Sequence, residues 1–311
     1  MKKALSVAAL VLGLTGSALA ADLPHYKAPP PPPLPPPPLW TGFYVGLNAG
    51  GTWGNSNNIW TSSAPIASIP GSAAAARFAA FSALGASGVS QGNTSGFIGG
   101  GQIGYNWQFY NSFVAGVEAD IQGVAGSNTN RTSVTAVGAF PFFGANEVLT
   151  TAITTSKRLD YIGTVRGRLG WLFTPTLLVY GTGGLAYGGV SVSTGIAQFN
   201  NDCAQFPANC ITSAAFSSGA FSDTRVGWTA GAGLEWMFMP NWSAKVEYLY
   251  YDLGNVSYSA GVLATFGNTF LPNTLVSGVV SQSQTRFNGN IVRAGVNYHF
   301  NWGAAPVVAK Y

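Results

Sequence analysis

Apolar and polar residues alternate along several stretches of the chain, most clearly around the segment Trp236–Trp242. Every second residue of Val226–Phe238 is apolar, while Arg225 and Glu235 occupy the other parity. The alternation resumes after Pro240-Asn241, two residue types that favour a tight turn. Period-two alternation is typical of β-strands with two different faces. This stretch therefore predicts a β-hairpin with one apolar and one polar face.

The same Trp-x-Phe pattern, followed by a short turn, also occurs at Trp107 and at Trp171, so that three copies lie about 65 residues apart. Regular spacing of this kind indicates an internal repeat. Aromatic residues at one height beside each short turn are typical of the girdle of a membrane barrel. The alternative is three ordinary hairpins whose aromatic residues lie in a core. The predicted girdle comprises Trp107, Phe109, Trp171, Phe173, Trp236, Phe238, Trp242, Tyr298 and Phe300.

Long and short connections alternate between the predicted strands. Four long segments, residues 55–92, 127–156, 194–222 and 252–284, alternate with the three short turns, which gives eight strands. Within the first long segment, Ala73–Ala83 predicts a brief helix. Helical patterns do not recur between the strands, as a TIM barrel or a doubly wound sheet requires. The pattern predicts an all-β fold, an eight-stranded antiparallel up-and-down transmembrane β-barrel over residues 40–300 with long external loops and short periplasmic turns.

Charged residues within the predicted strands always take the parity opposite to that of the large apolar residues. Because Arg or Lys on a lipid-facing position costs about 2–4 kcal/mol at the bilayer midplane, we expect the charges to point inward. Side chains just fill the interior of an eight-stranded barrel, and opposite charges there should pair. The predicted lumen charge network has six basic and five acidic members: Glu118, Asp120, Arg158, Asp160, Arg166, Arg168, Arg225, Glu235, Lys245, Glu247 and Arg293.

A charge-filled lumen argues against a general diffusion pore, and together with the four long loops it favours, as a first hypothesis, a structural and surface protein of the outer membrane. Glycines on inward positions, such as Gly100, Gly104 and Gly231, leave room for a narrow passage, so a small-solute porin stays an alternative. A third hypothesis is adhesion or recognition by the long external loops.

The composition suits a membrane protein that has no membrane-spanning helix. Hydrophobic residues make up 47% of the chain and charged residues only 8%. Beyond the N-terminus, no apolar run approaches the ~20 residues that a membrane helix requires. The formal net charge of +4 includes Lys2 and Lys3, and no basic run supports nucleic-acid binding.

The N-terminal region predicts export. Residues 1–20 have the pattern of a signal peptide, with Lys2-Lys3, an apolar stretch and a small-residue cleavage site at Ala18-Leu19-Ala20. Residues 21–39 form a predicted proline-rich periplasmic linker, in which Pro29–Pro38 contains nine prolines and favours polyproline II. Both ends of the barrel are then periplasmic, and residues 301–311 form a C-terminal tail.

The sequence predicts no catalytic, cofactor or metal site, and hence no enzyme. Cys203 and Cys210 enclose six residues, and in an exported protein this spacing predicts a disulfide. His25 lies in the linker, and His299 faces inward near the end of the last strand. No nucleophile and carboxylate accompany His299 in the order that a hydrolase needs, so we interpret it as a hydrogen-bonded rim residue.

Five stretches resemble the outer-membrane β-barrel family of the alphaproteobacteria, which is often called a porin family. They are Trp40–Gly46, Tyr180–Gly188, Gly231–Trp236, Lys245–Asp252 and Val292–Phe300. The resemblance covers the strands between about residues 40 and 300 and leaves the long loops unmatched. It implies an eight-stranded barrel in the cell outer membrane whose partners are outer-membrane lipid and, during insertion, the barrel-assembly machinery. It implies a role in envelope integrity and surface exposure, and it supplies no catalytic residue.

Overall fold

The computed structural model describes residues 39–126, 129–141, 146–200, 214–266 and 274–300. The chain divides into two compact units, Met1–Pro37 and Pro38–Tyr311, and all the described residues belong to the second. The predicted signal peptide, the linker before Leu39, the Cys203–Cys210 disulfide and the C-terminal tail lie outside the described residues.

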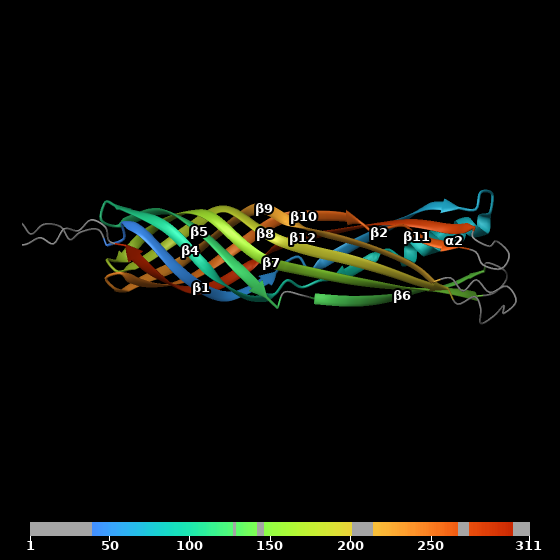
Figure 1. Cartoon of the computed structure of the whole chain (residues 1–311), viewed down its shortest axis with the longest axis horizontal. Coiled ribbons are helices and arrows are strands. Elements are labelled where there is room, and N and C mark those ends of the chain that lie inside the picture. The colour runs from blue at the N-terminus through green and yellow to red at the C-terminus, as the bar shows by residue number, and fades with distance from the viewer. Residues whose placement is uncertain (1–38, 127–128, 142–145, 201–213, 267–273, 301–311) are drawn as a thin grey trace, which may run out of the picture. The chain divides into compact units, whose positions relative to one another are not determined.

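The described part of the second unit consists of antiparallel strands and a helix (Figure 1). The prediction of an all-β antiparallel barrel is confirmed, although the sheet has twelve strands. The elements are β1 Gly42–Gly54, β2 Asn58–Ser68, α2 Ala73–Gly85, β3 Gly88–Gln91, β4 Gly96–Phe109, β5 Phe113–Ala125, β6 Thr129–Pro141, β7 Asn146–Thr174, β8 Leu177–Asn200, β9 Ala214–Met239, β10 Trp242–Ser259, β11 Leu263–Phe266 and β12 Leu275–Phe300.

Eight of the twelve strands form a closed ring of hydrogen-bonded neighbours, in the order β1-β4-β5-β7-β8-β9-β10-β12, and β12 pairs with β1 to close it. The closing register runs from Phe43 opposite Phe300 to Gly54 opposite Gly289. Between β5 and β7, the backbone pairing ends at Tyr161, which marks one end of the ring. We call this part of the molecule the closed ring. It satisfies the backbone donors and acceptors of its strands without a free sheet edge.

The three predicted short turns connect β4 to β5, β7 to β8 and β9 to β10, and they lie together at one end of the closed ring (Figure 1). The last two contain Pro175 and Pro240. In the first, Tyr110 and Asn111 have φ values of 47° and 57°. Positive φ at two successive residues is the geometry of a tight hairpin, and asparagine accepts it more readily than tyrosine.

The four segments predicted as long loops contain much regular structure instead. β7, β8 and β12 run 29, 24 and 26 residues, far beyond the closed ring, and β2, β3, β6 and β11 pair beside them. We call the strands above the ring the upper extension. The prediction failed there because Ser and Thr replace the large apolar residues on the alternating positions, although Thr favours strands as strongly as an apolar β-branched residue.

Helix α2 packs within the upper extension and agrees with the helix predicted from Ala73 to Ala83. Ser72 caps its first turn, with its side chain accepting a hydrogen bond from the Ala75 backbone N–H at 3.2 Å. Ser82 and Gln198 of β8 exchange two hydrogen bonds of 2.5 and 2.7 Å. Among the described helical residues, no helix is long and apolar enough to cross a membrane.

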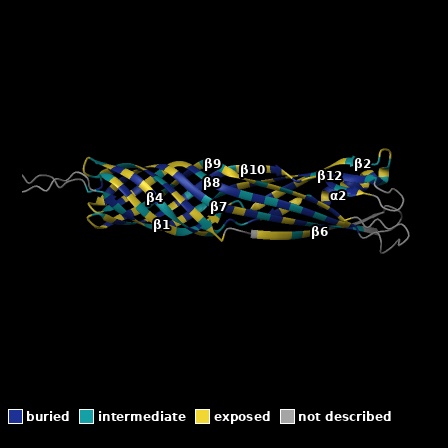
Figure 2. Ribbon diagram, viewed as in Figure 1, coloured by how far each residue is buried: buried dark blue, intermediate teal, exposed yellow. Residues whose placement is uncertain are grey.

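Inward side chains of the closed ring are arranged in layers, and the order of the layers follows β7. Leu172, near the turns, belongs to an apolar cluster with Trp40 and Met237. The charged Arg168 and Arg166 come next along the strand, and Ile162 then belongs to a second apolar cluster. Figure 2 shows the buried and exposed residues alternating along the strands, as period-two geometry requires.

A buried tyrosine ring occupies the space that Gly104 leaves open. A Cβ atom added at Gly104 would collide with the ring of Tyr44, whereas the nearest atom to a Cβ at the outward-facing Gly167 lies 3.9 Å away. We predict that Gly104→Ala lowers the free energy of unfolding by about 1–3 kcal/mol through overpacking. Gly167→Ala is the matched control. Urea unfolding of protein refolded in detergent micelles measures both, and equal midpoints would contradict the prediction.

Candidate functional site

Eight of the eleven residues predicted for the lumen network converge in one layer of the closed ring, and all eight are buried. Four are basic and four are acidic, so the formal charges cancel. Their side chains come from five strands, which places opposite charges on facing walls of the ring. The members are Glu118, Asp120, Arg166, Arg168, Glu235, Lys245, Glu247 and Arg293.

Strand register places many of these charges directly opposite one another. Glu118 of β5 faces Arg166 of β7. Glu247 of β10 faces Arg293 of β12, and Lys245 faces Glu235 on the other side of β10. Opposite charges at facing positions stabilise a strand pair, so pairing and charge pattern support the same register.

The guanidinium of Arg166 connects three carboxylates. Its Nη2 atom lies 2.5 Å from Glu118 and 2.9 Å from Asp120, and its Nη1 atom lies 2.9 Å from Glu247. Glu247 belongs to β10, which is not a neighbour of β7 in the ring, so this contact spans the lumen. The planar guanidinium presents several donors in fixed directions, which suits it to such a position.

Arg293 and Lys245 complete the same cluster from the opposite wall. Arg293 binds Glu247 through Nη2 at 2.5 Å and Asp120 at 2.9 Å. The Lys245 Nζ atom donates to both carboxylate oxygens of Glu118, at 2.9 and 3.0 Å. Each carboxylate therefore accepts charge-assisted hydrogen bonds from more than one cation.

Arg168 and Glu235 form the part of the network nearest the short turns. Arg168 donates to Glu235 at 2.6 Å and lies over the ring of Tyr180, with 4.0 Å between its Cζ atom and the ring centroid. Tyr44 links the two parts, because its hydroxyl donates to Glu118 at 2.6 Å and accepts from Arg168 at 2.9 Å. His299 bonds Ser243 at 2.8 Å beside this pair. Tyr44 and Tyr180 were not predicted as members because they are uncharged, although both are buried inside the ring.

The network can hold the walls together but offers little free chemistry. Each of its charges pairs with an opposite charge, although Nε of Arg168 and Nη1 of Arg293 have no hydrogen-bond partner among the described residues. Apolar layers lie on both sides of it along the barrel axis. Within the described residues, no group of three His, Cys, Asp or Glu side chains could hold a metal ion. Removal of one partner from a buried ion pair of this kind is strongly destabilising, mainly because it leaves the other charge buried and unpaired.

Three predicted members lie outside the network: Arg158, Asp160 and Arg225. The first two pair with each other at 2.7 Å on exposed side chains. The cause is a β-bulge at Asp160, which inserts one residue between the pairs of Leu159 and Tyr161 and exchanges the two faces of β7 beyond it. Arg225 is half-buried above the network and donates to the Asn255 carbonyl at 3.1 Å. A period-two pattern cannot be extended through a bulge that the sequence does not reveal.

The same bulge turns Lys157 inward, so the period-two pattern did not predict it as a member of the lumen. Lys157 lies beyond Tyr161, above the closed ring, and is 1% exposed. Its Nζ atom donates to the carbonyls of Ser56 and Arg286, each at 2.7 Å, and to the Thr285 hydroxyl at 3.1 Å. No carboxylate pairs with it among the described residues. Burial lowers the pKa of its ammonium group to about 8.

The nine residues of the predicted girdle lie on the outer wall near the short turns, and they contact one another in pairs. Ring centroids are 5.6 Å apart for Trp107 and Phe109, and 5.2 Å apart for Trp242 and Tyr298. Similar pairs join Trp171 to Phe173, Trp236 to Phe238 and Tyr298 to Phe300.

Comparisons with known proteins find relatives of this chain. The family model described as outer membrane protein beta-barrel domain matches residues 6–300. The 31 kDa outer-membrane immunogenic protein of Brucella melitensis biotype 1 is 33% identical over 301 residues, covering 96% of this chain and 100% of that protein. The 22 kDa outer membrane protein of Rhizobium leguminosarum bv. viciae is 32% identical over 181 residues, covering 55% of this chain and 63% of that protein. The crystal structure of the outer membrane protein OprG from Pseudomonas aeruginosa matches with a TM-score of 0.35 and 12% identity, covering 84% of this chain and 97% of that protein.

Removal of Glu118 should be strongly destabilising. Glu118→Ala leaves Arg166 and Lys245 short of a buried partner, and we predict a loss of about 3–5 kcal/mol in the free energy of unfolding. Asp160→Ala, which breaks an exposed pair, is the matched control and should cost no more than about 1 kcal/mol. Equilibrium urea unfolding measures both, and similar small losses would show that the network does not stabilise the barrel.

Lys157 should make stability depend on pH. Its pKa of about 8 in the folded state is below the unfolded value, so between these values the unfolded chain binds more protons and stability rises with pH. We predict that the free energy of unfolding of the wild type gains about 2–3 kcal/mol relative to Lys157→Met between pH 7.5 and about 10.5. Subtracting the free energy of unfolding of Lys157→Met at each pH removes the contribution of the other titrating groups. A constant difference across this range would contradict the prediction.

Proposed function

Because this chain belongs to the outer membrane protein β-barrel family and is located in the outer membrane, we propose that its closed ring spans the membrane as an eight-stranded barrel. We further propose that the protein has a structural and surface role in the cell envelope, with a lumen closed by its own side chains. No enzymatic activity is part of this proposal.

The length and the outer face of the closed ring support the membrane-spanning part of the proposal. In β7 the ring portion, from Tyr161 to Trp171, has eleven residues, and a transmembrane strand needs ~9–11. Large apolar side chains are exposed on the outer wall, for example Leu47 at 74% and Val117 at 62%. Such residues are costly in water and favourable against lipid. The girdle then lies at the periplasmic interface, with the chain entering at Trp40 from the same side.

One observation carries the structural role: the charged layer is neutral overall, each of its charges lies beside an opposite charge, and apolar layers enclose it. A conducting pore keeps a continuous water-filled path lined by polar groups. Here Ile98, Ile162 and Ile291 belong to one apolar cluster on the lumen side of the ring, and Leu178 and Met237 belong to the cluster near the turns. Ions would have to pass both clusters and break the ion pairs between them.

The porin alternative depended on space at inward glycines, and that space is largely filled. The ring of Tyr44 covers Gly104, and the Gln122 side chain lies 2.9 Å from a Cβ built at Gly100. The Leu249 side chain lies 2.9 Å from the corresponding position at Gly231. Each of these glycines lies opposite the residue that fills its space on the neighbouring strand, and this close packing along the wall favours the closed barrel over the narrow passage.

The upper extension supports the surface part of the proposal. Under this orientation its strands and α2 project from the membrane on the side opposite the short turns, where external loops of a barrel lie (Figure 1). Adhesion or recognition by this region stays a second candidate, favoured by the large exposed surface of its strands. Outer-membrane lipid and the barrel-assembly machinery are the partners that the proposal requires.

Planar-bilayer recordings test the proposed role. The full chain, refolded in detergent and checked for folding by heat-modifiable gel mobility, should show no frequent large conductance steps, because the lumen is closed. Frequent large steps would overturn the closed lumen.

Liposome swelling in sugars provides the second readout, and swelling that changes on Arg166→Ala or Arg168→Ala would favour the porin. Asp160→Ala, whose side chain lies outside the lumen network, is the control for nonspecific leakage.

A further inference from the structure

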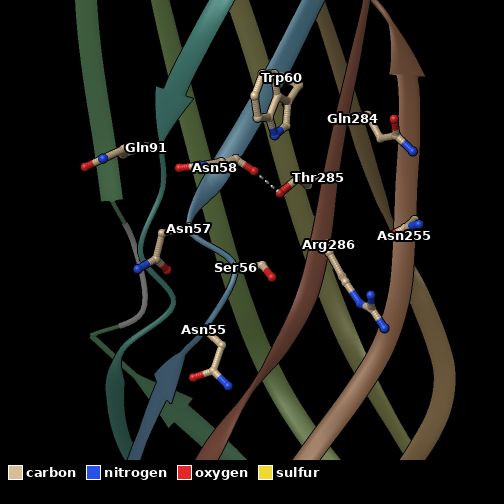
Figure 3. A pocket seen from close by; sticks show the side chains of 10 residues that line it. All are labelled: Asn55, Ser56, Asn57, Asn58, Trp60, Gln91, Asn255, Gln284, Thr285 and Arg286. Atoms are coloured by element: carbon tan, nitrogen blue, oxygen red, sulfur yellow. Dashed lines mark hydrogen bonds between the residues drawn. The ribbon is translucent and has the colours of Figure 1, made fainter.

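A polar pocket lies on the outer face of the wall, immediately above the closed ring (Figure 3). It forms where β1 ends and β2 begins, so that β12 exchanges one neighbouring strand for the next. Its volume is about 620 Å³. Figure 3 shows it between Gln91 and Asn255, with Trp60 towards one end and Asn55 towards the other.

Amide side chains dominate the lining of this pocket. Within the described part of the chain, the side-chain amides of Asn58, Gln91, Asn255 and Gln284 form no hydrogen bonds. The Oδ1 atom of Asn57 is buried and also has no partner there. Each amide group offers both donors and an acceptor. Several such groups around one pocket suit a ligand whose own groups both donate and accept hydrogen bonds.

Trp60 adds a large apolar surface to this polar lining. Its side chain is 59% exposed on the outer face of β2. An exposed indole ring beside polar groups can stack on the flat apolar face of a ligand while the polar groups orient it.

The pocket lies outside the apolar band of the membrane. Arg286, which lines it, is twelve residues from Tyr298 of the girdle along β12. That separation is about 40 Å along the strand, or about 30 Å along the barrel axis at a tilt of about 40°. The apolar band of such barrels is about 25 Å tall. Trp60, which lies farther from the girdle than Arg286 does, is therefore beyond the acyl-chain region.

The charge of the lining points to an uncharged ligand. Arg286 is the charged residue of the lining, and it already pairs with Asp252, which its Nη2 atom contacts and its Nε atom binds at 3.3 Å. The remaining lining residues are neutral. An anion-binding site would present a cation without such a partner.

The pocket is held in shape from several directions. The Asn290 side chain donates to Asn55 at 2.6 Å, and the Ser56 backbone N–H donates to Asn288 at 3.0 Å. Gly92 donates to the Asn57 carbonyl at 2.6 Å. From the inner side, Lys157 binds the carbonyls of Ser56 and Arg286, as described above. A fixed site loses little entropy when a ligand binds.

We infer that this pocket binds a neutral saccharide, with the indole of Trp60 stacked on one sugar ring and the surrounding amides bonded to its hydroxyl groups. A pyranose ring has the required combination, because its hydroxyls donate and accept while one face presents C–H groups. The sugar can belong to a glycolipid of the same membrane or to a soluble polysaccharide. The site goes beyond the proposed function, and only its distance from the lipid rests on the proposed orientation.

An array of neutral oligosaccharides probed with the refolded full chain in detergent micelles tests the inference. The wild type should bind at least one of them, and calorimetry should give the affinity. Trp60→Ala should lower that affinity about tenfold or more, equivalent to about 1.4 kcal/mol of binding free energy. Trp60→Tyr should keep most of it, because tyrosine can also stack.

Trp53→Ala is the matched control, since Trp53 is also an exposed tryptophan but lies in β1 and does not line the pocket. It should bind as the wild type does. No binding anywhere on the array, or equal affinity for Trp60→Ala and Trp53→Ala, would overturn the inference. Lipid nanodiscs that carry the bound sugar on a lipid headgroup then identify the source: stronger binding there than to the free sugar indicates the glycolipid, and equal binding indicates the soluble glycan. Conductance is measured separately, so failure of this site leaves the proposed role untouched.

Discussion

The contact between Arg166 and carboxylates from two other strands is the interaction on which the closed ring depends most. Glu118 and Asp120 approach it along the wall, and Glu247 approaches it across the lumen. An ionised guanidinium away from water is costly unless several acceptors surround it. The strands must therefore keep the register and separation that bring these acceptors together. Backbone pairing closes the ring and sets its width, and this network joins its opposite walls.

The other features of the molecule follow from that layer. Apolar clusters above and below it surround the ion pairs with a low-dielectric environment, which strengthens them. The glycines near it leave room for the rings and long side chains that complete the packing, as Gly104 does for Tyr44. A barrel stabilised in this way is suited to carry a large extension, in keeping with the proposed structural role.

Above the ring, the wall is no longer uniform. The change of neighbour from β1 to β2 beside β12 interrupts the ladder, and Lys157 binds two carbonyls at that interruption from within. The outer side of the same interruption forms the amide-lined pocket. A break in backbone pairing thus produces both a buried cation and an outward site, because backbone and side-chain groups freed from the ladder need other partners.

The sequence by itself determined the antiparallel barrel, its three short turns and the outward position of the girdle, because period-two alternation directly records which face each residue occupies. It also identified the charged residues that meet in the lumen, from Glu118 on β5 to Arg293 on β12. Only the tertiary structure decided where the inward and outward faces of a strand are exchanged. The bulge at Asp160 placed Arg158 outside and Lys157 inside, and backbone pairing extended strands through segments rich in Ser and Thr. Bulges and pairing partners depend on contacts between distant strands, which a local pattern does not contain.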